Sequence, residues 1–102
     1  MAEILVLYKT PTDPAAFDKY YAETHIPLAK KLPGLRKYQI SQGPVASPAG
    51  PSGVYLIATL SFDSMAAVQT ALTSPEGQAA AGDLPNFASG GVDLMFCDTK
   101  EV

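Results

Sequence analysis

The order of the predicted secondary structure along this chain indicates a ferredoxin-like α+β fold, in which two helices cover one face of a four-stranded antiparallel sheet. The elements follow one another as strand, helix, strand, strand, helix, strand, which is the βαββαβ pattern of that fold. The first and third strands of this fold lie at the sheet centre, and here they are the two most continuously apolar segments. The length of 102 residues is that of one domain, so we expect residues 1–102 to form a single domain.

The first half of the chain supplies a strand, a long helix and a second strand. Residues 3–9 are a short apolar run, which is typical of a strand. The Asp-Pro pair at residues 13–14 suits the N-cap and first position of a helix, and apolar side chains recur at helical spacing over residues 17–32. The Pro-Gly pair at residues 33–34 ends this helix. Residues 35–42 mix polar and apolar positions and predict a partly exposed edge strand.

The second half repeats the pattern after a long loop that is rich in Pro, Gly and Ser. Residues 54–62 are a strongly apolar strand, and Asp63 or Ser64 then caps a second helix. Residues 74–76 begin a further short helical piece, because a capping residue is again followed by a proline, here Ser74 and Pro75. Residues 92–98 form the last predicted strand.

Both faces of the predicted sheet are apolar. The three most apolar strands carry apolar side chains at successive positions, whereas a sheet that is covered on one face only should alternate with polar ones. An uncovered apolar face favours association, and its simplest partner is a second copy related by a two-fold axis. We therefore predict a homodimer through the helix-free face, which a charge at Leu56 or Ile57, whichever points outward, should disrupt.

The composition argues against several classes of partner and cofactor. The net charge is −3, which disfavours nucleic acid. There is one histidine and one cysteine, no close pair of metal ligands and no glycine-rich phosphate motif, so we predict no metal and no cofactor. No signal peptide precedes Glu3 and no apolar run could span a bilayer, so we expect a cytoplasmic protein without membrane partners. The cysteine, Cys97, is expected to be a small core residue.

The predicted first helix contains Pro27, two residues after His25, the only histidine of the chain. A proline inside a helix lacks the N–H, clashes with the preceding turn at a cost of about 3 kcal/mol, and pushes the residue before it away from helical geometry. We predict a break or kink between Thr24 and Leu28, which aims His25 into a cavity between helix and sheet. The alternative is a border histidine that bonds a backbone carbonyl and has no chemical role.

Several motifs occur in a characteristic order along nearly the whole chain: YY at 20–21, HIPL at 25–28, LPGL at 32–35, SPEGQ at 74–78, NFA at 86–88 and GGV at 90–92. Together they resemble the EthD family, small proteins named for a component encoded with bacterial ethyl tert-butyl ether degradation genes. The resemblance implies a dimeric α+β barrel with a pocket between the helices and the sheet of each subunit. It also implies that His25 is the candidate for chemistry in that pocket.

His25 is the predicted catalytic residue, since an unperturbed pKa of about 6.5 lets a histidine act as acid or base near neutrality. The predicted substrate-binding residues are Tyr20, Tyr21, Tyr8, Tyr55, Asp83 and Asn86. One or two of the strand tyrosines Tyr8, Tyr38 and Tyr55 are expected to line the pocket. In the alternative reading the tyrosines belong to the core, while the aspartate and asparagine cap the turn before the last strand.

Three functions are open on this evidence. The first is a cofactor-free lyase, isomerase or cyclase in which His25 moves a proton on a small apolar carbonyl, phenolic or ether-derived compound. The second is oxidative, either a cofactor-independent oxygenase or an accessory to an ether-degrading monooxygenase, as the family name suggests. The third is a non-catalytic binder of a small hydrophobic ligand. We take the first as the working hypothesis.

Overall fold

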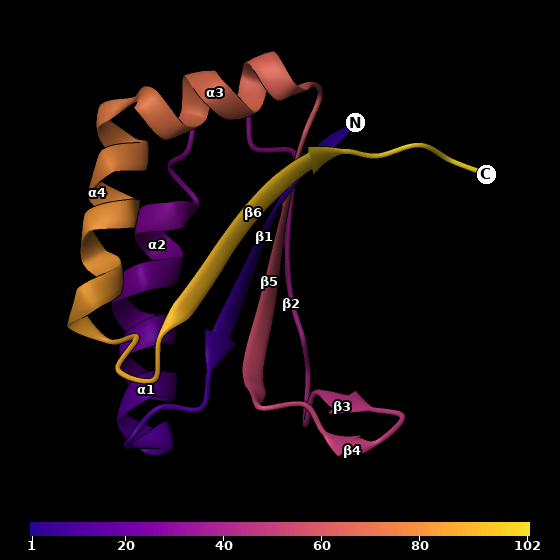
Figure 1. Cartoon of the computed structure of the whole chain (residues 1–102). Helices are drawn as coiled ribbons and strands as arrows, with labels where there is room; N and C mark the ends of the chain where they lie inside the picture. The colour runs from indigo at the N-terminus through magenta and orange to yellow at the C-terminus, as the bar shows by residue number, and fades with distance from the viewer.

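A four-stranded antiparallel sheet runs through the structure, a computed structural model that describes residues 1–102 (Figure 1). Its strands, in spatial order, are β2 (Lys37–Ile40), β5 (Val54–Phe62), β1 (Ala2–Lys9) and β6 (Val92–Asp98). The ferredoxin-like prediction is confirmed, because the two most apolar strands, β1 and β5, occupy the centre and β2 lies at an edge. The long loop contains one feature that was not predicted, a two-stranded ribbon of β3 (Ala46–Ser47) and β4 (Gly50–Pro51).

The helices gather on one side of the sheet (Figure 1). In chain order they are α1 (Pro14–Tyr20), the π-helical turn η1 (Tyr21–His25), α2 (Ile26–Ala29), α3 (Met65–Thr73), α4 (Pro75–Asp83) and the 3₁₀ turn η2 (Leu84–Asn86). The predicted caps are present: Asp13 accepts from a backbone N–H of α1, and Ser64 and Ser74 do the same for α3 and α4. Each side chain satisfies one backbone N–H that the first helical turn leaves without a partner. No helix is both long and apolar enough to cross a bilayer.

The first α-helix is interrupted as predicted, but by a π-helical turn at Tyr21–His25 and not by a break at Pro27. The prediction that the residue before the proline leaves helical geometry is wrong. Ile26 keeps helical dihedral angles of φ −56° and ψ −46°. The irregularity lies one turn earlier, where the Ile26 N–H donates to the carbonyl of Tyr21, five residues back, instead of four. This i to i+5 hydrogen bond makes the turn wider than an α-helical one, and the chain continues in helical geometry through Pro27 in the first turn of α2. We call Tyr21–His25 the π-turn.

The two faces of the sheet differ in cover. On β1 the side chains turned toward the helices are buried, namely Ala2, Ile4, Val6 and Tyr8. The intervening Leu5 and Leu7 lie on the helix-free face and are half-buried, beside Ile57 of β5 and Met95 of β6. Met95 is 50% exposed. This apolar face has no cover within the chain, and Ile57, not Leu56, is the residue of β5 that points to it.

The prediction that Cys97 belongs to the core is wrong. Cys97 pairs with Glu3 on the helix-free side of β6 and is exposed. The sequence around it is uniformly apolar, and an apolar run on an edge strand does not show which of its side chains a helix covers.

Candidate functional site

A cavity of about 60 Å³ lies between the helices and the sheet. All four strands of the sheet contribute to its wall, as do the helices from the π-turn to η2, and 13 of its 15 lining residues are hydrophobic. The polar side chains in the wall are His25, Tyr8 and Tyr38. Of the lining residues, Ala81 on α4 and Leu94 on β6 are exposed, so they mark its mouth. The cavity is therefore an apolar pocket with a small polar group inside.

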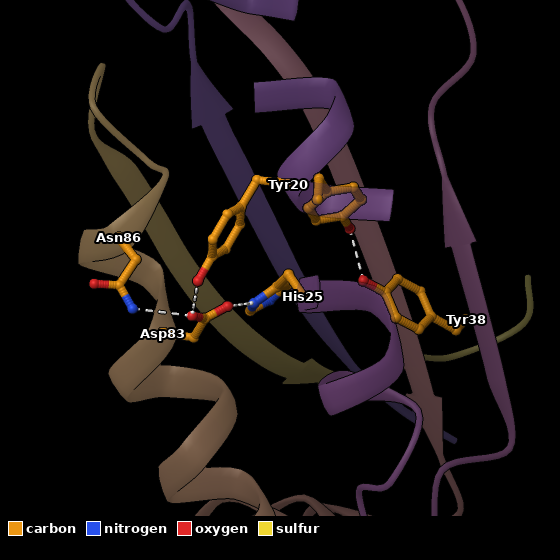
Figure 2. Close-up of polar contacts among 6 residues, drawn as sticks. Tyr20, His25, Tyr38, Asp83 and Asn86 are labelled. Carbon is orange, nitrogen blue, oxygen red and sulfur yellow. Dashed lines mark hydrogen bonds and ion pairs between the residues drawn. The ribbon is translucent and has the colours of Figure 1, made fainter. Parts of the chain in front are cut away.

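His25 stands in the wall of this cavity, as predicted, and is 5% exposed. Its Nδ1 lies 3.0 Å from Oδ2 of Asp83, at the end of α4 (Figure 2). Its Nε2 makes no hydrogen bond within the chain. Every side-chain nitrogen or oxygen that is fully enclosed does have a hydrogen-bond partner, so Nε2 must be partly accessible. The ring is thus anchored through one nitrogen and has the other free. The alternative of a histidine bonded to a backbone carbonyl is not what the structure shows.

Asp83 is the centre of a hydrogen-bond network (Figure 2). Its Oδ1 accepts from the hydroxyl of Tyr20 at 2.5 Å and from the side-chain amide of Asn86 at 3.0 Å, which leaves Oδ2 for His25. Burial by itself would raise the pKa of Asp83, but the hydrogen bonds from these three side chains outweigh it and lower the pKa below its ordinary value. The carboxylate is therefore ionised near neutral pH and acts only as an acceptor.

The protonation state of His25 follows from its surroundings. Burial lowers its pKa, and the hydrogen bond and charge of Asp83 offset this only in part, so the net shift is downward. The imidazole is then neutral near pH 7. Because Asp83 is an acceptor only, the single ring proton lies on Nδ1 and Nε2 carries the lone pair. An imidazole oriented in this way is a general base.

The π-turn brings Tyr20 and His25 to the same carboxylate. In a regular α-helix, residues five positions apart point about 140° away from each other around the axis. The i to i+5 hydrogen bond of the π-turn places His25 one full turn below Tyr20 instead, so both side chains reach Asp83. This local distortion near Pro27 therefore helps to build the site, which is a common role of π-turns.

Aromatic rings hold the imidazole in place. The ring of Tyr21 stacks on that of His25 at a centroid distance of 5.6 Å, and Phe87 packs against it at 4.7 Å. The hydroxyl of Tyr21 lies 2.6 Å from that of Tyr38 on β2 (Figure 2). Tyr21 and Tyr8 are core residues as well as neighbours of the site, so the structural reading of these tyrosines also holds.

The other predicted site residues lie outside the cavity. Tyr20 and Asn86 line a separate groove of about 230 Å³, to which neither His25 nor Asp83 contributes. Tyr55 donates to Asp18 at 2.8 Å and lines a third groove of about 570 Å³. A direct role for these side chains in ligand binding stays a prediction. The sequence analysis undervalued Tyr38, which lines the cavity. The signal that could have identified it is the alternation of side chains along β2, which turns Tyr38 to the same face of the sheet as the buried Leu60 that it pairs with.

No group of three or more His, Cys, Asp or Glu side chains comes together in a way that could hold a metal ion. The donors around Asp83 are one histidine, one phenol and one amide, which satisfy a single carboxylate.

The sheet order, with the helices on one face, makes the chain a ferredoxin-like α+β domain. It belongs to the EthD family, whose domain model matches residues 9–91. An 11.0 kDa protein encoded in the thcB–thcC intergenic region of Rhodococcus erythropolis is 42% identical over 100% of this chain and 98% of its own.

Two solved structures show how far the fold extends. An EthD family protein from Bacillus halodurans is 36% identical, with a TM-score of 0.89 over 98% of this chain and 99% of its own. SnoaB, a cofactor-independent oxygenase from Streptomyces nogalater, is 14% identical, with a TM-score of 0.69 over 99% of this chain and 94% of its own. At that identity the second likeness establishes a common fold alone.

Proposed function

We propose that the protein is a cofactor-free acid–base enzyme in which Nε2 of His25 removes a proton from a small, largely apolar molecule bound in the cavity. The observation that carries this proposal is the state of one imidazole. It is buried, neutral and oriented by an ionised aspartate, with its unprotonated nitrogen free at an apolar cavity. An orienting carboxylate of this kind fixes the tautomer of a catalytic histidine in other enzymes.

Water exclusion supports the same reaction type. A base in an apolar pocket does not compete with bulk water for its substrate, and electrostatic effects are stronger there than in solution. No lysine or arginine lines the cavity, so the pocket favours a neutral compound over an anionic one. Small carbonyl and phenolic compounds are neutral and can be largely apolar. Each also has a proton that a neutral imidazole can take up during a reaction.

The second candidate is a non-catalytic binder of a small hydrophobic molecule, which the apolar lining favours. The oxidative alternatives rest on the names of relatives, among them a cofactor-independent oxygenase, and not on a residue of this site.

We also propose that two copies associate through the helix-free face. The half-buried Leu5, Leu7 and Ile57 and the exposed Met95 form a continuous apolar surface there, for which the chain itself provides no cover. A surface of this kind on a monomer marks an interaction site.

Hydrogen–deuterium exchange at the methyl group of acetophenone in D₂O tests the acid–base function, with proton NMR as the readout. We expect the protein to accelerate exchange beyond an equal concentration of free imidazole. His25→Gln, whose amide can still donate to Asp83, should remove most of the acceleration, since general-base help is worth about 10²–10⁴-fold. Equal rates for the two proteins would refute the proposal. Binding of the ketone without exchange would favour the binder.

A further inference from the structure

Besides the free nitrogen of His25, the cavity contains a second buried polar atom without a partner, the hydroxyl of Tyr8. Tyr8 is 1% exposed, yet its hydroxyl makes no hydrogen bond in the chain. Every side-chain oxygen that is fully enclosed has a hydrogen-bond partner, so the Tyr8 hydroxyl must be partly accessible. Tyr8 is one of the residues that line the cavity. A buried hydroxyl without an acceptor costs free energy unless a ligand or water accepts from it.

The hydrogen-bonded hydroxyls of Tyr21 and Tyr38 provide one more proton, besides that of Tyr8, that is free to be donated. Two hydroxyls carry two protons, and the single hydrogen bond between them, at 2.6 Å, uses only one. Tyr38 lines the cavity and Tyr21 does not, so the free proton reaches a ligand when Tyr21 donates to Tyr38. Burial raises the pKa of all three tyrosines, so they stay protonated near neutral pH and act as donors.

The two donors and the base face the same small cavity, because Tyr8, Tyr38 and His25 all line its wall. The ring of Tyr8 also packs edge-on against that of Tyr21, at a centroid distance of 5.5 Å. A ligand in this cavity can therefore meet both hydroxyls as well as the free nitrogen of His25.

We propose that Tyr8 and Tyr38 bind one carbonyl oxygen and that the ligand is a neutral ketone or aldehyde whose apolar remainder leaves through the mouth at Leu94. The cavity of about 60 Å³ takes only the reacting end of such a ligand, since each enclosed water molecule already needs about 10–15 Å³ of cavity volume. Leu94 and Phe96, on the helix side of β6, are 42% and 41% exposed and continue the apolar surface beyond the mouth.

The inference rests on the proposed function, because it supplies the other half of the same chemistry. If His25 takes a proton from the carbon next to the carbonyl, the C–H electron pair becomes the C=C bond of an enolate. The C=O π electrons then move onto the oxygen, and the two phenolic O–H groups stabilise the charge that develops there. The proton returns from the imidazolium to carbon, so no oxidant or second reactant is needed.

A pair of ligands with the same shape isolates the oxygen contact. Acetophenone and α-methylstyrene differ only in that a C=CH₂ group replaces the C=O group, and dissociation constants for both can be measured from NMR shifts. Two neutral hydrogen bonds should give the wild type a preference for the ketone of roughly 5- to 100-fold. Tyr8→Phe and Tyr38→Phe should each reduce this preference, and the double variant should bind both ligands equally.

The outcomes separate this inference from the proposed function. A ketone preference that persists in the double variant, or a wild type that prefers neither ligand or binds neither, would overturn the inference. A preference without methyl exchange would refute the acid–base function alone, and exchange without a preference would refute the oxygen site alone. Tyr8→Phe removes a hydroxyl that has no partner, so the melting temperature without ligand should not fall. Should that variant misfold, Tyr38→Phe on the edge strand carries the test by itself.

Discussion

Replacement of Asp83 by asparagine should reverse the tautomer of His25 and abolish its function as a base. The hydroxyl of Tyr20 and the amide of Asn86 both donate to Oδ1, so the carbonyl oxygen of the new amide will occupy that position. Its NH₂ group then faces Nδ1 of His25, 3.0 Å away in the wild type. Two N–H donors cannot face each other at that distance. The ring proton must move to Nε2, and the nitrogen at the cavity becomes a donor.

The expected loss of activity is about 10²–10⁴-fold, the usual contribution of a general base and comparable with a histidine held in the wrong tautomer. Stability should fall as well, because three hydrogen bonds to a charged acceptor become bonds to a neutral one or are lost. With about 1.5–3 kcal/mol for a typical charged hydrogen bond, partial weakening of the set amounts to roughly 1–3 kcal/mol. For a domain of this size that lowers Tm by about 5–20 °C.

The single histidine makes the assay direct, because the imidazole nitrogen signals of uniformly labelled protein need no assignment. Two-dimensional ¹H–¹⁵N spectra should show a protonated Nδ1 in the wild type and a protonated Nε2 in Asp83→Asn. Asn86→Ala is the matched control, since it removes one donor from the carboxylate and keeps the charge. It should leave the tautomer unchanged. The same tautomer in wild type and Asp83→Asn, or undiminished ketone exchange in that variant, would refute the reasoning.

Four further outcomes follow from the structure. Burial lowers the pKa of folded His25 below the unfolded value of about 6.5, so the folded state binds fewer protons than the unfolded state. The free energy of unfolding should therefore decrease as pH falls below that value, and His25→Gln should flatten this part of a plot of Tm against pH. Ile57→Lys should shift sedimentation to the monomer, unlike Ala79→Lys on the exposed side of α4; a wild type that is monomeric at micromolar concentration would contradict the proposed dimer. Gly90→Ala would bring a Cβ within 2.1 Å of a backbone carbonyl and should cost about 1–3 kcal/mol in chemical denaturation, whereas an unchanged midpoint would show that the loop yields freely. Pro27→Ala restores an N–H for the carbonyl four residues earlier, so the π-turn should close and the His25 nitrogen shifts should change; a variant structure with the wide turn intact would exclude the proline as its cause.

The fold was largely predictable because its signals are local. Apolar runs located β1 and β5, the side chains of Asp13 and Ser74 announced helix starts, and continuous apolarity indicated a second face in need of cover. The failure at Cys97 has the same origin. An apolar run shows that a strand is apolar, but which face a helix covers depends on how the elements pack.

The site was predictable in position but not in chemistry. His25 drew attention as the only histidine, near a proline, and it does stand in the cavity wall. Its partner, Asp83, lies 58 residues further along the chain, at a helix end where a polar residue is unremarkable. Residue type suggested a ligand contact or a turn cap for this aspartate. Only the packing of α4 against the π-turn shows that it fixes the tautomer of the histidine.

The irregular turn near Pro27 depends both on the local sequence and on how the helices pack. A proline forbids one hydrogen bond, which is a local fact, but the chain can answer by breaking, kinking or widening the turn before it. The choice depends on what the displaced side chains meet. Here the wider turn lets Tyr20 and His25 reach one carboxylate, and we expect these two hydrogen bonds to offset the cost of the distortion. If so, the geometry of the first helix is stabilised by α4. Loss of Asp83 should then loosen the π-turn itself, with faster amide exchange at residues 24–26 than in the Asn86→Ala control.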